Sequence, residues 1–220
     1  MSERGARHAA LDTVIFDIGG VLIDWNPRYL YRQLFDDEQT MERFLADVCD
    51  SQWNEQQDAG RPWDEAVQLR SAEFPEHAAL IAAYRTRWDE MLRGPMHDSV
   101  AILDELRARG VRLYALTNWS QETFPLAFER YAFLRAFEGI VVSGQERMIK
   151  PDPAIFDVLL NRYGVQPERA VYIDDAPRNV AVAAKLGMHA LHFRDAAVLR
   201  ADLVALGLLD SASSEASQHG

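Results

Sequence analysis

The stretch TVIFDIGG, residues 13–20, combines a short apolar run with one acidic residue and two glycines. The run does not alternate with polar residues, so it predicts a strand over Thr13–Asp17 that is buried on both faces. Asp17 ends this strand, and Gly19 and Gly20 allow the following backbone to approach a bound group closely. Such a strand is typical of a parallel sheet with a ligand site at its carboxyl edge.

Further apolar runs and the helical patterns between them indicate the rest of the sheet. Strands are predicted at Arg112–Thr117, Gly139–Ser143, Ala170–Asp174 and His189–Phe193. Helices are expected to begin at Asp98, Asp152 and Pro177 and to end near Gly110, Gly164 and Gly187. Strands and helices that alternate at this spacing predict an α/β fold with a doubly wound, Rossmann-like parallel sheet.

One segment breaks the alternation, because residues 25–93 carry helical patterns and no strand pattern. The predicted helices are Arg28–Phe35, Gln39–Cys49, Trp63–Phe74 and Glu76–Leu92. The pairs Asn26-Pro27 and Gly94-Pro95 mark both ends of the segment as breakpoints. We therefore expect a core of residues 1–24 and 94–209, a small all-helical cap domain at 25–93, and a flexible tail at 210–220.

Composition narrows the possible partners. The chain has 220 residues, of which 34 are acidic and 23 basic, and its formal net charge is −11. This excess repels phosphate backbones and anionic lipid, and no apolar run reaches the ~20 residues of a membrane span, so neither nucleic acid nor membrane is expected. The chain has a single cysteine, Cys49, and its first segment lacks an apolar signal core, so we expect a cytoplasmic protein. We expect it to be a monomer or a homodimer.

Polar residues follow the predicted strands that border the crevice, at the strand ends or, for Lys150, in the loop after the third strand. They are Asp17, Thr117, Asn118, Lys150, Asp174 and Asp175. Several carboxylates at the mouth of an apolar sheet repel one another and lose hydration, and one lysine offsets only one charge. A divalent cation would remove the excess, and hard oxygen ligands suit Mg²⁺. The carbonyl of Gly19 is a further candidate ligand.

These groups also suit phosphoryl transfer. Asp17 can act as a nucleophile while Mg²⁺ and Lys150 cancel the repulsion between an anionic phosphate and a carboxylate. The Thr117 hydroxyl and the amides of residues 118–120 can bind the non-bridging oxygens. Only two of the 23 basic residues are lysines, which favours a chemical reason for lysine at position 150. Each of these residues alone could be a helix cap or a strand-end surface residue. Polar groups that follow four different strands and meet at one edge of the sheet favour a functional site instead.

Four ordered motifs resemble those of the haloacid dehalogenase-like hydrolase superfamily. They are FDIGGVLID at 16–24, LTN at 116–118, KPD at 150–152 and YIDD at 172–175. The resemblance covers about residues 14–193, and the helical segment between the first two motifs is similar to the cap of the subfamily of haloacid dehalogenases and small-molecule phosphatases. It implies that Asp17 is the nucleophile and that Thr117 and Lys150 orient and neutralise the transferred group. The Mg²⁺ ligands that it implies are Asp17, the carbonyl of Gly19 and Asp174, supported by Asp175.

One position departs from the pattern of this family. Its phosphatases usually carry a second aspartate two residues after the nucleophile, as a general acid and base, and here that position is Gly19. Some sugar-phosphate phosphatases of the subfamily resemble this chain in having glycine there. Without a built-in acid, we expect slower hydrolysis of esters with poor leaving groups. Asp24 is a candidate to replace the acid through water, or else it packs at the connection to the helical segment.

The leading interpretation is an Mg²⁺-dependent hydrolase of small phosphate monoesters, including sugar phosphates, that forms an aspartyl phosphate on Asp17. One alternative is a 2-haloacid dehalogenase, in which Asp17 attacks carbon. Such enzymes usually have an aromatic residue at the position of Gly19 and lack the paired acids Asp174 and Asp175, which speaks against it. A second alternative is a relative that binds phosphate or a partner without catalysis.

Substrate selection is expected in the helical segment. Trp25, Trp53 and Arg61 are the candidate substrate-binding residues there, together with Asn118 from the core. An indole face beside polar groups such as Asn54 and Asp58 can bind a sugar or another small organic phosphate. The alternative is that the tryptophans form the small helical core, since aromatic side chains mostly serve burial.

Overall fold

Strand β1, Thr13–Phe16, is the central strand of a five-stranded parallel sheet with the order β5-β4-β1-β6-β7. The structure is a computed structural model that describes residues 10–211. The other strands are β4 (Arg112–Thr117), β5 (Gly139–Val142), β6 (Ala170–Asp174) and β7 (His189–His192). This sheet confirms the predicted doubly wound α/β fold, and each strand lies within one residue of its predicted bounds. All but the first two residues of the predicted tail, 210–220, lie outside the described residues.

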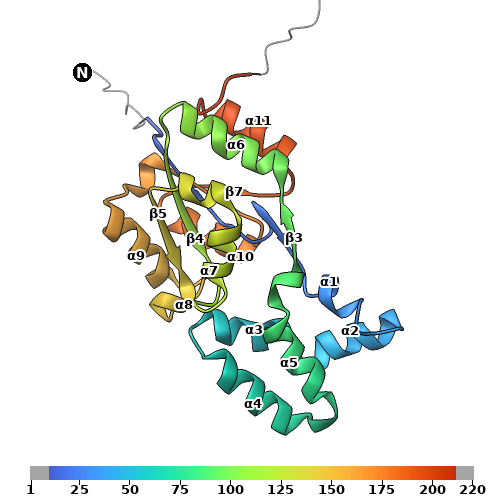
Figure 1. Cartoon of the computed structure of the whole chain (residues 1–220). Helices are drawn as coiled ribbons and strands as arrows, with labels where there is room; N and C mark the ends of the chain where they lie inside the picture. The colour runs from blue at the N-terminus through green and yellow to red at the C-terminus, as the bar shows by residue number, and fades with distance from the viewer. Residues whose placement is uncertain (1–9, 212–220) are drawn as a thin grey trace, which may run out of the picture.

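Helices cover both faces of the sheet (Figure 1). Successive side chains of β1 point to these two faces in turn, so each face of the strand contacts a different pair of helices. Val14 and Phe16 pack against α6 (His97–Ala108) and α11 (Ala196–Ala205). Ile15 faces the opposite way, toward α9 (Pro153–Tyr163) and α10 (Pro177–Lys185). Two further helices of the core are α7 (Phe124–Arg130) and α8 (Ser143–Glu146). Both faces of β1 are therefore buried, as its unbroken apolar run predicts.

The predicted helix ends hold in part. Asp152 caps α9 by accepting a hydrogen bond from the Ala154 amide at 2.9 Å, and Gly164 ends that helix with a φ of 62°. Asp98 is not the cap of α6, because the helix begins one residue earlier and its N-cap position, Met96, makes no side-chain cap bond. Asp98 lies in the first turn instead, where a carboxylate still interacts favourably with the helix dipole.

The segment between β2 (Ile23–Trp25) and β3 (Leu92–Pro95) folds as a group of helices beside the sheet, which we call the helical insert (Figure 1). Its helices are α1 (Arg28–Tyr31), α2 (Glu38–Asp47), α3 (Ser51–Asp58), α4 (Trp63–Glu73) and α5 (Ala78–Thr86), with 3₁₀ turns at Pro75–His77 and Trp88–Met91. None of the helices in residues 10–211 is long and apolar enough to span a membrane.

The structure corrects three sequence predictions in this segment. The two connections are short antiparallel strands, β2 and β3, whereas the sequence predicts no strand there. Helix α3 is absent from the prediction, because its sequence SQWNEQQD carries little apolar pattern. The single helix predicted over Glu76–Leu92 is interrupted at Arg87. The following turn places the ring of Trp88 against that of Trp119 in the core, with the ring centres 5.4 Å apart. This tertiary contact outweighs the local helical preference.

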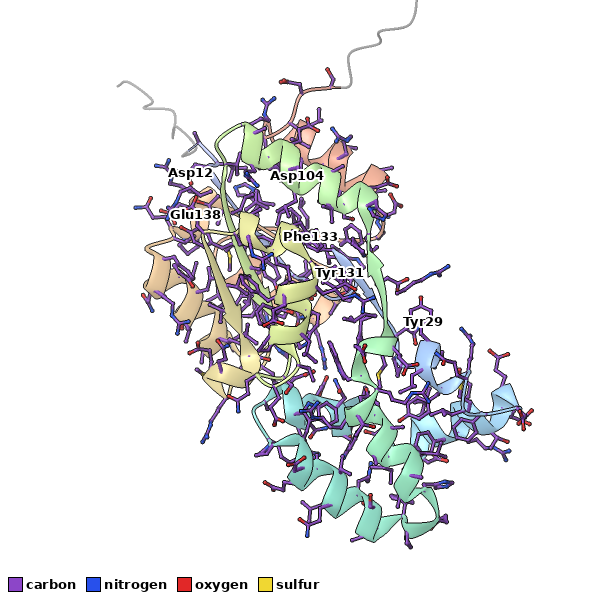
Figure 2. All side chains as sticks on the ribbon, in the orientation of Figure 1. Asp12, Tyr29, Asp104, Tyr131, Phe133 and Glu138 are labelled. Carbon is purple, nitrogen blue, oxygen red and sulfur yellow. The ribbon has the colours of Figure 1, made fainter. Side chains whose placement is uncertain are left out.

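The ribbon of β2 and β3 joins the helical insert to the sheet. Asp24 pairs with Gly94 across this ribbon, and its carboxylate accepts a hydrogen bond from the Tyr29 hydroxyl at 2.8 Å. Figure 2 shows Tyr29 beside β3, where the Arg93 guanidinium lies 5.7 Å from the centre of its ring. Asp24 therefore belongs to the connection between the two parts of the chain.

Candidate active site

The nucleophile candidate, Asp17, is positioned by the register of the central strands. Phe16 of β1 pairs with Ile173 of β6, and the Asp17 amide donates to the Ile173 carbonyl at 2.8 Å. The next residue of each strand therefore brings Asp17 and Asp174 to the same edge of the sheet. The Ile18 amide donates to Asp17 Oδ1 at 2.7 Å, which fixes the orientation of the carboxylate.

Lys150 joins the two carboxylates. Its Nζ lies 2.9 Å from Asp17 Oδ2 and 2.7 Å from Asp174 Oδ2, and its side chain is 1% exposed. Asn118 holds the lysine loop against the end of β4, because its Oδ1 accepts from the Lys150 amide at 2.8 Å and its Nδ2 donates to the Lys150 carbonyl at 3.0 Å. Thr117, fully buried, is the last residue of β4 and precedes Asn118.

Asp174 is the most completely bonded carboxylate of the site. Besides Lys150, it accepts hydrogen bonds from the Tyr172 hydroxyl at 2.5 Å, the Ala176 amide at 2.8 Å and the Asn179 amide group at 3.0 Å. Burial alone would raise the pKa of Asp174, but the Lys150 ammonium and these donors outweigh it, and the pKa lies below its ordinary value. Asp174 is therefore ionised at neutral pH.

Asp17 carries the charge that Lys150 does not balance. The pKa of Asp17 is raised to about 7, because burial and the neighbouring Asp174 charge together outweigh the lowering effect of the Lys150 ammonium. One ammonium is shared between two carboxylates, so the second negative charge has no protein counterion within this pair. A cation bound at the site would return Asp17 to its ionised, nucleophilic form.

The geometry of the acidic residues suits a small divalent cation. Carboxylate oxygens of Asp17, Asp174 and Asp175 all lie within 4.8 Å of one another. Gly20 keeps this arrangement possible: its φ is 74°, and a Cβ there would lie 2.4 Å from Asp175 Oδ2. The donor set consists of hard oxygens, which fit Mg²⁺. Gly19 lies at the same cleft, and its carbonyl remains a predicted ligand.

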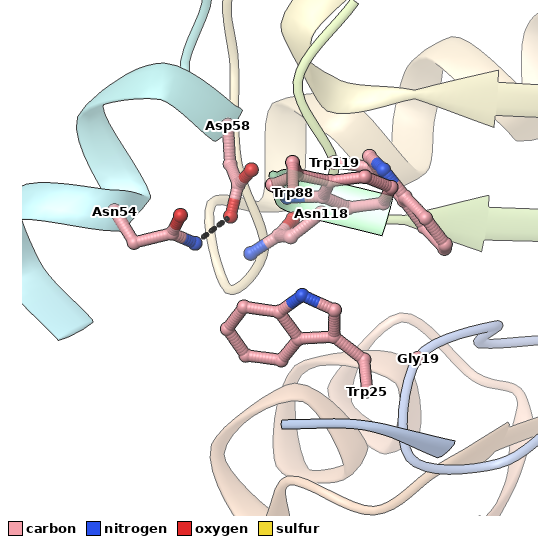
Figure 3. Close-up of a pocket in the computed structure, with 7 residues that line it drawn as sticks. All are labelled: Gly19, Trp25, Asn54, Asp58, Trp88, Asn118 and Trp119. Carbon is pink, nitrogen blue, oxygen red and sulfur yellow. Dashed lines mark hydrogen bonds between the residues drawn. The ribbon is translucent and has the colours of Figure 1, made fainter. Parts of the chain in front are cut away.

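A cleft of about 720 Å³ separates this edge of the sheet from the helical insert. Asp17, Lys150 and Asp175 line one wall, and Asn54 and Glu55 of α3 line the other. Adjoining this cleft, with shared lining residues, lies a smaller hollow of about 70 Å³, which we call the tryptophan pocket (Figure 3). Its lining residues are Gly19, Trp25, Asn54, Asp58, Trp88, Asn118 and Trp119.

Direct bonds hold the helical insert against the core beside this pocket. The Ser143 hydroxyl donates to the Asp58 carbonyl at 2.6 Å and accepts from the Trp119 amide at 2.8 Å. Trp63 Nε1 donates to the Ser120 hydroxyl at 3.1 Å. The Trp119 amide, predicted to bind phosphate oxygens, is thus already engaged by Ser143.

The structure separates the predicted substrate-binding residues into two groups. Trp25 and Asn118 line the tryptophan pocket. Trp53 does not reach the cleft, because it is 4% exposed and its ring packs edge-on against Trp63 at 5.6 Å. Arg61 lines a different hollow and donates through Nε to Gln57 at 2.7 Å. The prediction is therefore corrected for these two: Trp53 belongs to the core of the helical insert, and Arg61 braces its surface.

Several residues that the structure places at the site are not predicted from the sequence. Trp88 and Trp119 complete the aromatic walls, and Tyr172 and Asn179 orient Asp174. Tyr172 carries a signal that could have been read, because it lies two residues before Asp174 on the same face of β6. Trp88 carries none, since its position depends on the break after α5.

Comparison with known proteins agrees with this geometry. Residues 11–187 match the model of the haloacid dehalogenase-like hydrolases, and the chain belongs to this family. It is 31% identical over 183 residues to a sesquiterpene phosphatase of Aspergillus oryzae, across 82% of this chain and 89% of the relative. It is therefore an enzyme of the hydrolase class, with a phosphatase among its relatives.

Two solved structures share the fold. One is a family enzyme of Bacteroides thetaiotaomicron in complex with magnesium and inorganic phosphate (TM-score 0.62, 22% identity, 81% of this chain and 92% of that chain). The other is an L-2-haloacid dehalogenase of Xanthobacter autotrophicus (TM-score 0.59, 16% identity, 89% and 83%). The fold alone therefore does not separate phosphatase from dehalogenase chemistry, and the site residues must do so.

Proposed function

We propose that the protein hydrolyses small phosphate monoesters in a Mg²⁺-dependent reaction with Asp17 as the nucleophile. The observation that carries this proposal is the buried Lys150 ammonium shared between Asp17 and Asp174, with Asp175 beside them. The group has an unbalanced negative charge and opens on a cleft large enough for a small organic phosphate. The sesquiterpene phosphatase relative supports the same reaction class.

Each residue then has a role that follows from its position. Asp17, Asp174 and Asp175 would hold Mg²⁺ together with the Gly19 carbonyl, and the ion supplies positive charge that offsets the phosphate. Asp17 Oδ attacks phosphorus as the bond from phosphorus to the alcohol oxygen breaks, and water then hydrolyses the aspartyl phosphate to release phosphate and free Asp17. Lys150 stabilises the negative charge of the phosphoryl oxygens, and the Thr117 hydroxyl donates to one of them.

The same residues argue against attack on carbon in a haloacid. A carboxylate that displaces halide needs no metal, yet this site gathers three carboxylates, of which only two are paired with the single ammonium. Gly19 also leaves the cleft without an aromatic wall at that position. We propose further that the helical insert is a cap domain, since it closes the cleft opposite the nucleophile and supplies the walls that contact the rest of the substrate.

The test is a panel of phosphate monoesters assayed for phosphate release, with Mg²⁺ and with excess chelator, beside a halide-release assay on 2-chloropropionate. We expect turnover of several esters with Mg²⁺, loss of at least about 10²-fold with chelator, and recovery when Mg²⁺ is returned. Halide release that is indifferent to chelator, without phosphate release, would replace this proposal with the dehalogenase.

A further inference from the structure

The reaction needs a proton donor that the nucleophile loop lacks. When the ester bond to an alkyl group breaks, the departing oxygen must gain a proton, because an alkoxide is a poor leaving group. Gly19, two residues after Asp17, has no side chain, and a Cβ placed on it would meet nothing within 4 Å. Asp24 is turned away in the ribbon, where it accepts from Tyr29.

Most carboxylates on the insert side of the cleft are already committed. Glu42 pairs with Arg28 through two bonds of 2.5 Å, and Glu55 pairs with Arg178. Asp50 caps α3 by accepting from the Trp53 amide at 2.6 Å. Among the residues that the structure describes, Asp58 is the acid of this wall that forms neither an ion pair nor a helix cap.

Asp58 also lines the part of the cleft that adjoins the nucleophile loop. It is the one carboxylic acid lining the described part of the tryptophan pocket, in which Gly19 forms part of the opposite wall. Figure 3 shows its carboxylate facing the Trp25 indole, with the Asn118 amide between the two walls. Asn54 Nδ2 donates to Asp58 Oδ2 at 3.0 Å, and the bond from Ser143 to its carbonyl fixes its backbone.

We propose that Asp58 is the general acid that protonates the leaving oxygen of an alkyl phosphate and the general base for the hydrolytic water. The proposal rests on the proposed function. In the first step Asp17 Oδ bonds to phosphorus, the phosphorus–oxygen bond to the alcohol breaks, and the leaving oxygen takes the proton of Asp58. In the second step water bonds to phosphorus and gives a proton to Asp58, and the bond between phosphorus and Asp17 breaks to release phosphate.

The protonation behaviour of Asp58 agrees with this role. The pKa of Asp58 is raised to about 7, because burial, helped by the Glu55 charge, outweighs the lowering effects of the Ser120 amide and the Lys150 ammonium. A carboxyl group with such a pKa is present in both forms near neutral pH, as a group that gives and takes a proton requires.

The pocket also indicates the kind of alcohol that the site accepts. The indoles of Trp25, Trp88 and Trp119 form its walls, so a flat or apolar carbon group fits between them. Trp25 Nε1 is buried without a hydrogen-bond acceptor among the described residues. A hydroxyl or ether oxygen on the leaving group would supply that acceptor. The proposal therefore extends the substrate class to esters of weakly acidic alcohols that carry such a group.

The test compares two esters in the full-length protein with Mg²⁺: 2-phenylethyl phosphate, with a poor leaving group, and 4-nitrophenyl phosphate, with a good one. Asp58→Asn keeps the shape of the side chain but removes its titration. We expect kcat/KM for the alkyl ester to fall about 10²-fold or more and that for the nitrophenyl ester to fall less than about 3-fold. The alkaline limb of the alkyl-ester pH profile, with a pKa near 7 in the wild type, should disappear.

Two further variants make this result specific. Glu55→Gln removes a neighbouring cleft acid on the same helix but keeps the carboxyl group of Asp58. Because the Glu55 charge helps to raise the pKa of Asp58, the alkaline limb of the alkyl-ester profile should move to lower pH and persist, and below that limb both rates should change by the same small factor. Gly19→Asp in the Asp58→Asn background places an acid in the open space beside Asp17 and should restore alkyl-ester turnover at least in part. Equal losses for both esters in Asp58→Asn would overturn the role of Asp58 and leave the phosphatase intact. Absence of phosphate release from either ester in the wild type would overturn the proposed function itself.

Discussion

The two walls of the cleft hold their polar groups in different ways. On the sheet wall, Asp17, Lys150 and Asp174 are buried and bonded to one another. On the insert wall, Asn54 and Asp58 are half-buried and bonded mainly to each other, beside indole rings. Strand register fixes the first wall, whereas packing of the helices of the insert fixes the second. The positions of Asp17, Lys150 and Asp174 therefore depend on the backbone topology of the sheet, and those of Asn54 and Asp58 depend on how the insert packs against it.

The largest effect should follow from Asp17→Asn, which attacks the sheet wall at its centre. The side chain is nearly isosteric, so the fold should survive, but the amide is a poor nucleophile and a weaker metal ligand. We expect kcat for any phosphate ester to fall by at least about 10³-fold, which corresponds to about 4 kcal/mol of activation free energy. Steady-state kinetics and Mg²⁺ titration by calorimetry measure the two consequences. A variant that keeps a tenth of the activity would exclude covalent catalysis by Asp17.

A smaller but still large loss is expected for Lys150→Arg. The guanidinium keeps the charge, but it is larger and planar, and Lys150 is 1% exposed between two carboxylates and an anchored loop. The added volume should displace Asp17 or Asp174 by a fraction of an ångström or more. We expect kcat/KM to fall about 10²-fold. The measurement is kinetics with 4-nitrophenyl phosphate, which needs no acid from the insert wall. Wild-type rates would show that charge alone matters at this position.

The difference between the walls also explains how far the sequence predicts the molecule. Short apolar runs, most of them unbroken, place all five strands of the parallel sheet, and the polar residues at their ends and in the loop after β5 bring Asp17, Lys150 and Asp174 together as expected. Strand ends in a parallel sheet meet at one edge whatever the helices between them do. This rule allows the residues of the sheet wall to be predicted from local sequence patterns.

The residues of the insert wall are harder to predict from the sequence, because their positions depend on packing between distant segments. Helix α3, which carries Asn54 and Asp58, lacks an apolar repeat, and Trp88 reaches the pocket only through the break after α5. The sequence suggests Trp25 and Trp53 equally as substrate contacts, and only the structure separates them. A tryptophan side chain fits either a core or a pocket, so composition does not decide between the two.

The smallest expected effects test which part of the insert contacts the substrate. The variant is Trp25→Phe, and its control is Arg61→Ala. Trp25→Phe keeps an aromatic ring in the tryptophan pocket but removes the unpartnered Nε1. A lost hydrogen bond to substrate is worth about 0.5–1.5 kcal/mol, so KM for an oxygen-bearing ester should rise about 2-fold to 13-fold with little change in kcat. Arg61 lies at a different hollow and bonds to Gln57 of the insert, so Arg61→Ala should change KM less than about 2-fold. Kinetics on the best ester of the panel measure both. A larger change in KM for Arg61→Ala than for Trp25→Phe would move the substrate contact from the tryptophan pocket to the outer face of the insert.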